Sequence, residues 1–203
     1  MEGKRTATIA RETTETRIAL SIAIDGTGKY DVDTGIHMLD HLLEQFARHG
    51  LFDMTVRAES HRDIDHHHAV EDVAICLGQA LGRALGEGKG IARMGHAIVP
   101  MDEALAMVAV DMSGRGYAVL DAPFKRKKVG DMESDLVRHF LETMAREARA
   151  TIHVRLLSGS NEHHKAEAIF KALGRALDAA TRLDERIRGD VPSTKGVIEG
   201  GQP

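Results

Sequence analysis

The sequence is poor in the residue types that mark secreted or nucleic-acid-binding proteins. Its 203 residues include one cysteine, Cys76, no tryptophan, five phenylalanines, two tyrosines and four prolines. A single cysteine excludes an intramolecular disulfide framework and any zinc finger built on cysteine ligands. The 27 lysines and arginines are outnumbered by 31 acidic residues, and this net charge of −4 argues against a dedicated nucleic-acid-binding protein.

Long apolar segments are also absent. No stretch of about 18 apolar residues could form a transmembrane helix, and the first residues contain no apolar core of signal-peptide length. We therefore expect a cytoplasmic protein without a membrane or nucleic-acid partner. Cys76 lies in an apolar stretch, 73–77, and we expect its thiol to pack in the core, because reactive thiols occupy exposed, electropositive places.

Apolar periodicity predicts one order of strands and helices twice. The first set has strands at 6–10, 17–24 and 52–58, helices at 36–48 and 67–86, and a polar loop at 60–65. The second set has strands at 96–100, 104–112, 117–121 and 150–157 and helices at 132–147 and 162–182. These sets predict a single α+β domain over 1–203, in which a ββαβα unit occurs twice, over about 4–90 and 91–187, before a tail at 188–203.

Sequence identity and histidine placement both indicate this duplication. Residues 79–85 (QALGRAL) match residues 171–177 (KALGRAL) at six of seven positions. Both long helices also begin with the pattern His-His-x-x-Glu, and each preceding helix carries one more histidine. Chance similarity of two helices rich in alanine and leucine would explain the first match but not the second.

Histidine is the residue present in excess, with 12 copies, and six of them fall into two matched sets of three, each with one glutamate. In each helix the glutamate is reachable from both histidines, because residues three and four apart share a face. The adjacent histidines point about 100° apart, which favours ligands shared between two metal ions. A lone histidine is usually structural, but the doubled pattern predicts a metal site. The candidate ligands are His41, His67, His68, Glu71, His139, His163, His164 and Glu167.

Residue type only narrows the choice of metal. Imidazole suits zinc, copper, iron and nickel, whereas carboxylate adds manganese and magnesium. Three histidines and one glutamate for each ion would leave a coordination position open, as in a catalytic site. Mn²⁺ is compatible with this donor set, which contains no thiolate, but residue type alone leaves the metal undecided.

Several basic and hydroxyl residues predict a second feature, an anion pocket. Arg93 and Arg115 lie in loops that contain glycine, and Ser193, Thr194 and Lys195 lie together near the C-terminus. Hydroxyls, lysine and backbone N–H groups bind anions, although ordinary polar turns have the same composition. Beside a metal site, they suggest a phosphorylated substrate. We interpret the basic run 125–128 as a solvated loop.

Separated motifs, in this order along nearly the whole chain, resemble the imidazoleglycerol-phosphate dehydratase family. They are RETTET at 11–16, LDH at 39–41, HGLFD at 49–53, HHAVED at 67–72, PMDEA at 100–104, NEHH at 161–164, EAIFKA at 167–172 and PSTKG at 192–196. The resemblance implies a four-stranded sheet on two helices in each half, an α/β sandwich of the ribosomal protein S5 domain 2-like type. It also implies a shell of 24 subunits with active sites at subunit contacts.

The resemblance implies two Mn²⁺ ions held by the eight candidate ligands. It also implies substrate contacts, which are Glu15, His49, Arg93, Arg115, Lys171, Ser193, Thr194 and Lys195. The implied reaction is the loss of water from D-erythro-imidazole glycerol phosphate to give imidazole acetol phosphate in histidine biosynthesis, through an imidazolate and a diazafulvene-like intermediate. Glu15 is the candidate for acid–base catalysis, and Glu71 and Glu167 would act chiefly as metal ligands.

Two other classes of function fit parts of the pattern. A metal-binding or storage protein would use the eight ligands without a phosphate pocket. A two-metal phosphohydrolase would use both features, but its ligands are usually rich in aspartate with bridging carboxylates. The histidine-rich ligand set argues against that class.

Overall fold

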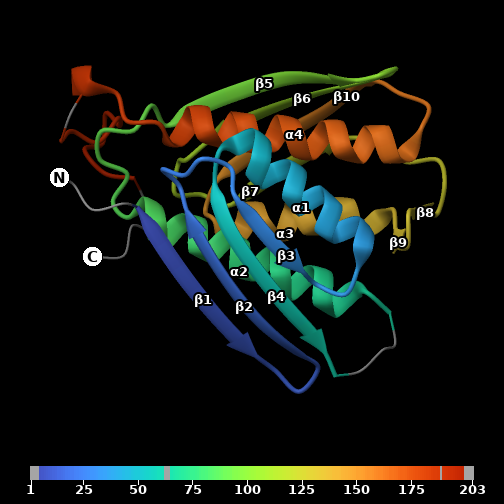
Figure 1. Ribbon diagram of the computed structural model, residues 1–203. Coiled ribbons are helices and arrows are strands. Elements are labelled where there is room, and N and C mark those ends of the chain that lie inside the picture. Colours follow the sequence, from blue (N-terminus) through green and yellow to red (C-terminus); the bar gives the residue numbers. More distant parts are fainter. Residues whose placement is uncertain (1–4, 62–64, 188, 199–203) are drawn as a thin grey trace.

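The computed structural model describes residues 5–61, 65–187 and 189–198 (Figure 1). Three parts of the predictions therefore lie outside the described residues. They are the first residue of the predicted first half, the middle of the predicted loop at 60–65, and parts of the predicted tail. Within the described residues, no helix is both long enough and apolar enough to span a membrane.

The two halves contain matched sets of elements. The first half consists of β1 (Thr6–Glu12), β2 (Thr16–Ala23), β3 (Tyr30–Asp33), α1 (His37–Gly50), β4 (Asp53–Ser60) and α2 (His67–Leu85). The second half consists of β5 (Met94–Met101), β6 (Ala104–Asp111), β7 (Tyr117–Asp121), β8 (Lys128–Val129), β9 (Met132–Glu133), α3 (Asp135–Glu147), β10 (Thr151–Ser158), α4 (Glu162–Thr181) and a short 3₁₀ helix (Glu185–Ile187). The predicted duplication is confirmed.

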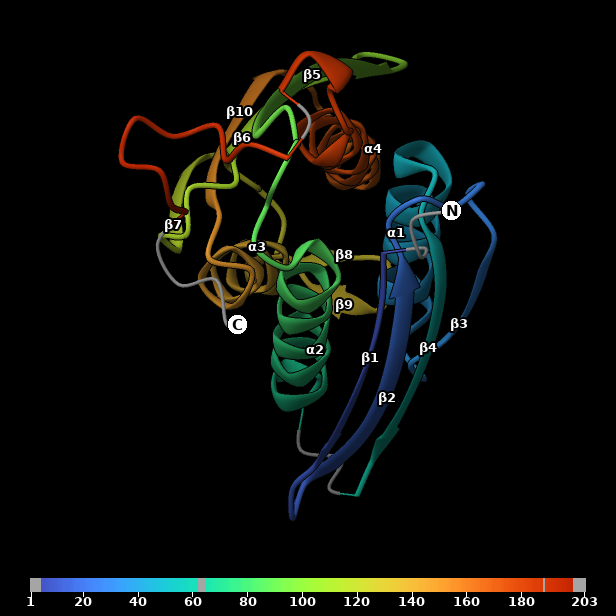
Figure 2. The same cartoon turned by 90° about the vertical axis from the view of Figure 1, so that its left-hand side faces the viewer.

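Each half forms a four-stranded sheet, in the orders β1-β2-β4-β3 and β5-β6-β10-β7. The last pair in each order is parallel, and the other pairs are antiparallel. Figure 2 shows the four helices between the two sheets. Successive side chains of a strand point to opposite faces of the sheet, and one of these faces packs on the core. In β6, for example, every second residue is buried. The predicted α+β sandwich is therefore confirmed.

The sequence pattern missed β3 and the short β8–β9 pair, and it misplaced two helix ends. β3 was not predicted, because its sequence Tyr-Asp-Val-Asp is short and has little apolar periodicity. The helix predicted at 132–147 begins only at Asp135, since Met132 and Glu133 form β9 with β8. The helix predicted at 36–48 extends to Gly50, and Leu51 follows it in the left-handed conformation, at φ 58°.

The structure also corrects how the two long helices align. The first histidines, His67 and His163, are 96 residues apart, whereas the matching segments 79–85 and 171–177 are 92 residues apart. The four-residue difference is about one helical turn. The helix bounds follow the histidines, which makes Gly78 the counterpart of Gly174. The six-of-seven match is thus one turn out of register, although the duplication that it indicated is correct.

These two glycines permit the close helix contacts at the centre of the molecule. A Cβ atom at Gly174 of α4 would lie 2.4 Å from the carbonyl oxygen of Phe46 in α1. A Cβ atom at Gly78 of α2 would lie 2.8 Å from the carbonyl oxygen of Met144 in α3. Both distances are far below van der Waals contact, so each pair of helices approaches as closely as glycine allows. The surrounding apolar side chains form one core across both halves.

Replacing Gly174 with alanine tests this close contact. We expect Gly174→Ala to lower the free energy of unfolding by about 1–3 kcal/mol, because a methyl group forced against backbone strains the packing. The matched control is Gly82→Ala, where the nearest atom would lie 4.0 Å from the added Cβ. There we expect a gain of up to about 1 kcal/mol from helix propensity. Chemical denaturation measures the free energy of unfolding of both variants. Equal changes in the two variants would contradict the assignment of Gly78, and not Gly82, as the counterpart of Gly174.

Candidate metal centre

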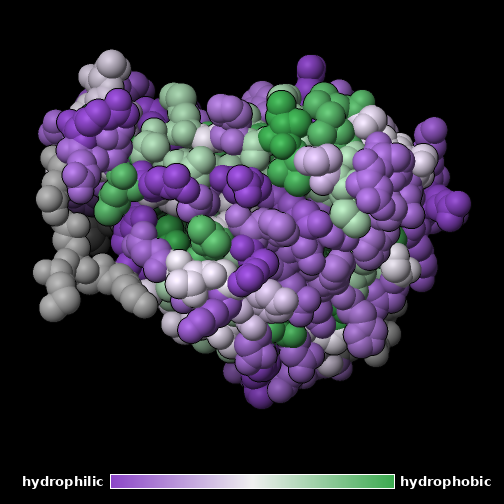
Figure 3. Space-filling model, turned by 45° about the horizontal axis from the view of Figure 1, so that its top comes forward, coloured by the Kyte–Doolittle hydropathy of each residue, from purple (hydrophilic) through white to green (hydrophobic). Residues whose placement is uncertain are grey.

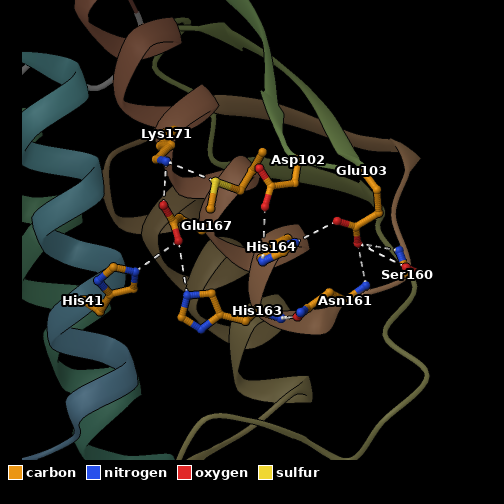
Figure 4. A network of polar contacts seen from close by, with 10 residues as sticks. His41, Asp102, Glu103, Ser160, Asn161, His163, His164, Glu167 and Lys171 are labelled. Carbon is orange, nitrogen blue, oxygen red and sulfur yellow. Dashed lines mark hydrogen bonds and ion pairs between the residues drawn. The ribbon is translucent and has the colours of Figure 1, made fainter.

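A first cluster of potential metal ligands joins α1 to α4. His41 Nε2 and His163 Nε2 each lie 3.2 Å from Glu167 Oε2, and the two imidazole rings stack with centroids 5.1 Å apart (Figure 4). Lys171 Nζ lies 2.5 Å from the other carboxylate oxygen. Burial would raise the pKa of Glu167, but hydrogen bonds from Lys171 and His41 and their charges lower it to about 2. We call His41, His163 and Glu167 the α1–α4 triad.

A second cluster joins α2 to α3. His139 Nε2 lies 3.4 Å from Glu71 Oε1, and the ring of His67 lies 4.4 Å from the ring of His139, centroid to centroid. Although Glu71 lies within ion-pair distance, His139 Nε2 is buried and forms no hydrogen bond with any of the described residues. A buried ring nitrogen without a partner is costly unless something else binds it. We call His67, Glu71 and His139 the α2–α3 triad.

Both triads fit a metal ion. In each, one ligand atom from every member lies within 4.8 Å of the others. Two imidazoles and one carboxylate suit first-row divalent metals, including Mn²⁺. The unpartnered nitrogen of His139 is explained if an ion occupies the α2–α3 triad.

Each triad combines the two halves of the chain. His41 belongs to the first half but lies with ligands of the second half. His139 belongs to the second half but lies with ligands of the first half. The sequence pattern grouped each of them with the glutamate of its own half. That pattern left open how the ligands divide between two ions, and the structure places each histidine with the other half's glutamate because α1 packs on α4 and α2 packs on α3. Neither triad would exist in a half that folded alone.

The second histidine of each pair points away from its triad. The ring of His68 stands at 88° to that of the preceding histidine, and His164 stands at 82° to its neighbour. His68 Nδ1 lies 3.1 Å from Glu15, and His164 Nδ1 lies 2.7 Å from Glu103. The structure therefore brings together six of the eight candidate ligands and leaves these two facing outward.

A network of polar side-chain contacts, which the sequence pattern did not predict, holds the start of α2 in place. Asp72, which follows Glu71, is buried and accepts a hydrogen bond of 2.7 Å from Arg11 Nε. Thr16 donates to the other oxygen of the same carboxylate. These contacts fix the helix turn that carries the first His-His pair against β1 and β2, and the hydrogen bond and charge of Asp72 raise the pKa of Arg11. Arg11 and Asp72 lie 61 residues apart in the sequence, so no local spacing predicted that they would pair.

Two acidic residues beside His164 were also not among the predicted site residues. Glu103 Oε2 contacts His164 Nδ1, and Asp102 Oδ2 lies 3.8 Å from His164 Nε2. Hydrogen bonds from His164 and from the backbone of Asn161 and Ser160 hold the pKa of Glu103 well below its usual range. The same carboxylate raises the pKa of His164. The signal in the sequence was the motif at 100–104, in which an Asp-Glu pair separates two strands.

The predicted substrate contacts are spread over several places in the fold. Lys171 contacts Glu167 of the α1–α4 triad, and burial together with the charges of Lys171 and Arg175 lowers the pKa of His49. Arg93 forms a two-pronged ion pair with Asp111 and donates to the carbonyl oxygen of Pro192 at 2.8 Å.

Arg93 thereby anchors the loop that carries Ser193, Thr194 and Lys195, where Ser193 Oγ accepts from the backbone N–H of Lys195. Arg115 lies in the turn before β7, where its N–H and carbonyl contact Ser113.

The sequence matches one known family over most of its length. The profile of the imidazoleglycerol-phosphate dehydratase family matches residues 34–177. A protein of that name from Roseiflexus sp. (strain RS-1) is 58% identical over 194 residues, which are 96% of this chain and 98% of the relative. Another from Dehalococcoides mccartyi (strain CBDB1) is 58% identical over 196 residues, which are 97% of this chain and 98% of the relative.

The fold matches solved structures with the same name. The crystal structure from Staphylococcus aureus aligns with a TM-score of 0.80 at 35% identity and covers 88% of this chain and 99% of the other. The crystal structure from Pyrococcus furiosus aligns with a TM-score of 0.80 at 40% identity and covers 94% of this chain and all of the other.

Removal of one triad member tests whether the α2–α3 triad binds metal. We expect Mn²⁺ to raise the melting temperature of the chelator-treated protein, since a ligand present at 100 times its Kd stabilises by about 2.7 kcal/mol. His139→Ala should lose much of this increase, whereas His153→Ala, an exposed position on β10, should keep it. Thermal melts with and without Mn²⁺ measure the difference. An undiminished increase in His139→Ala would argue against this site.

Proposed function

The chain belongs to the imidazoleglycerol-phosphate dehydratase family, which consists of hydro-lyases of histidine biosynthesis, and from this we propose that it uses two Mn²⁺ ions to convert imidazole glycerol phosphate to imidazole acetol phosphate. The observation that supports the metal dependence is the pair of triads, each completed across the two halves. The α1–α4 triad and the α2–α3 triad would each contribute to the site of one ion.

The protein groups prepare these positions for cations. Glu167, with a pKa of about 2, is ionised at neutral pH, so it offers a carboxylate without first losing a proton. Lys171 contacts the same carboxylate and would have to move away or stay on the oxygen that the metal does not use. When bound, the two ions supply Lewis-acid stabilisation of negative charge on the imidazole ring of the substrate. Such charge would favour departure of the neighbouring hydroxyl group of the substrate as water, once that group has received a proton.

Glu15 is our candidate for the proton transfers. It lies directly before β2, its carboxylate is one-third exposed, and it contacts His68 at 3.1 Å. A carboxylate at the edge of a metal centre can move a proton to the leaving hydroxyl or from the adjacent carbon. Glu71 and Glu167 serve chiefly as ligands, and Arg93 with the loop at 193–195 would bind the phosphate group.

The outward direction of His68 and His164 supports sites shared between subunits. Each has a metal-binding nitrogen that lies outside the triads of its own chain. A second copy of the chain could place its own triad against them. The outer face of the second sheet also exposes apolar side chains that a neighbouring copy would bury, among mostly polar surface (Figure 3). They are Met94, Ile98, Tyr117, Val119 and Leu157.

We therefore propose a cytoplasmic homo-oligomer, a shell of 24 subunits, with active sites at subunit contacts. A reducing compartment agrees with the single buried thiol of Cys76, whose pKa burial raises to about 11.

Glutamine at position 15 tests the role in proton transfer. With saturating Mn²⁺, we expect Glu15→Gln to lower kcat by about 10²–10⁴-fold, the range typical of general acid–base catalysis. Glu12→Gln is the matched control, because Glu12 is exposed on β1 and pairs with Arg17. Steady-state assays of imidazole acetol phosphate measure both variants. Near-normal turnover in metal-loaded Glu15→Gln would remove Glu15 from this role.

Mixed assemblies test the sharing of sites between subunits. One variant, His68→Ala with His164→Ala, keeps both triads, and the other, Glu71→Gln with Glu167→Gln, keeps both outward histidines. Each variant alone should be inactive. Co-expressed with different affinity tags and purified through both, the mixture should regain part of the activity, because some sites then combine intact residues from two chains. Mixed particles without any activity would contradict shared sites.

A further inference from the structure

The hairpin turn between β5 and β6 carries an acidic pair that neither the triads nor the proposed proton transfers use. Met101 pairs with Ala104, so only Asp102 and Glu103 form the turn, and Asp102 has φ 47°, as a two-residue hairpin requires. Ser158 Oγ donates to the carbonyl oxygen of Glu103 at 3.0 Å, which ties the turn to the end of β10. The pairing of β5 with β6 and the hydrogen bond from Ser158 therefore both hold the turn in place.

The carboxylate of Glu103 has two kinds of partner (Figure 4). Oε1 accepts from the backbone N–H groups of Ser160, at 3.0 Å, and Asn161, at 2.7 Å, and from Ser160 Oγ at 3.2 Å. Oε2 contacts Nδ1 of His164 at 2.7 Å. One oxygen thus fixes the loop before α4, and the other fixes one imidazole ring of that helix.

The contact with His164 determines which ring nitrogen carries the proton. An ionised carboxylate only accepts hydrogen bonds, so Nδ1 of His164 must be the donor. The neutral ring then has its lone pair on Nε2, the nitrogen that would bind a metal ion. Carboxylates commonly orient metal-binding histidines in this way. We propose that Glu103 is a positioning residue, which holds the ring plane and the tautomer of His164 so that Nε2 is available to a metal ion.

The other half of the chain has a related contact with a different partner set. Glu15 stands directly before β2 as Glu103 stands directly before β6, and Glu15 contacts Nδ1 of the equivalent histidine, His68. Among the described residues, the backbone N–H bonds that fix the carboxylate of Glu103 have no counterpart at Glu15. After duplication, one glutamate thus became fixed by its loop, and the other kept a simpler environment suited to proton transfer.

A purely structural role for Glu103 makes a different prediction. In that case the carboxylate would only satisfy the N–H groups before α4, as helix-capping groups do, and His164 would be a bystander. Glutamine separates the two roles. Its carbonyl oxygen can still accept from Ser160 and Asn161, but its NH₂ group would face Nδ1 of His164. Because that group only donates, the imidazole proton would move to Nε2 and block metal binding.

The experiment is Mn²⁺ titration of chelator-treated oligomers of the wild type and of Glu103→Gln, by calorimetry. The inference rests on the proposed function, since it takes His164 as a metal ligand. We expect Glu103→Gln to bind Mn²⁺ about 10–100-fold more weakly at one class of site, as loss of such an orienting group typically does. The melting temperature of the metal-free protein should stay close to that of the wild type. Pulsed EPR of bound Mn²⁺ should show less nitrogen coupling, as in His164→Ala.

Further variants keep the test decisive. Glu142→Gln, which removes an exposed carboxylate that pairs with Arg138 on α3, is the control for loss of charge and should bind Mn²⁺ as the wild type does. If Glu103→Gln does not fold, Glu103→Asp serves instead, because its shorter side chain cannot reach both partners. Unchanged Mn²⁺ affinity in a folded Glu103 variant would contradict the positioning role of Glu103 but would leave the proposed metal dependence intact. Absence of Mn²⁺ binding in the wild type would overturn the proposed metal dependence as well.

Discussion

The close packing of α1 on α4 and of α2 on α3 is the contact on which the rest of the structure depends. Gly174 and Gly78 let the backbones approach to distances that no larger residue permits. This approach brings His41 to Glu167 and His139 to Glu71, which lie on helices of opposite halves. A metal ion in either triad would therefore also join the two halves of the fold. Stability and metal binding are linked through these same helix contacts.

Duplication explains why two similar triads exist, and divergence explains why they differ. The α1–α4 triad has a buried carboxylate that Lys171 keeps ionised. At the corresponding place in α2, four residues after Glu71, stands Ile75, so the α2–α3 triad has no such lysine. Its glutamate is one-third exposed, and its buried histidine nitrogen forms no hydrogen bond within the part of the chain that the structure describes. The two units of the duplication thus acquired unequal electrostatic surroundings.

Much of the architecture could be predicted from the sequence, because helix and strand periodicities are local. Among the described residues, seven of the eight strands in the two four-stranded sheets and all four α-helices follow from apolar spacing, but β3 does not, since two of its four residues are aspartates. The register of the two long helices was ambiguous, because similar segments lie one turn apart in them. The helix bounds and the position of the glycines against facing backbone both identify Gly78, and not Gly82, as the counterpart of Gly174.

For the metal centre, the sequence by itself determined which residue types are available and which of them share one turn of a helix. The spacing of His163 and Glu167 guarantees that these side chains can meet. Only the tertiary structure decided which third residue joins them, and that His164 turns instead toward Glu103. The physical reason is that spacing fixes directions within one helix. The partner across a helix contact depends on packing between segments more than 100 residues apart, such as His41 and Glu167.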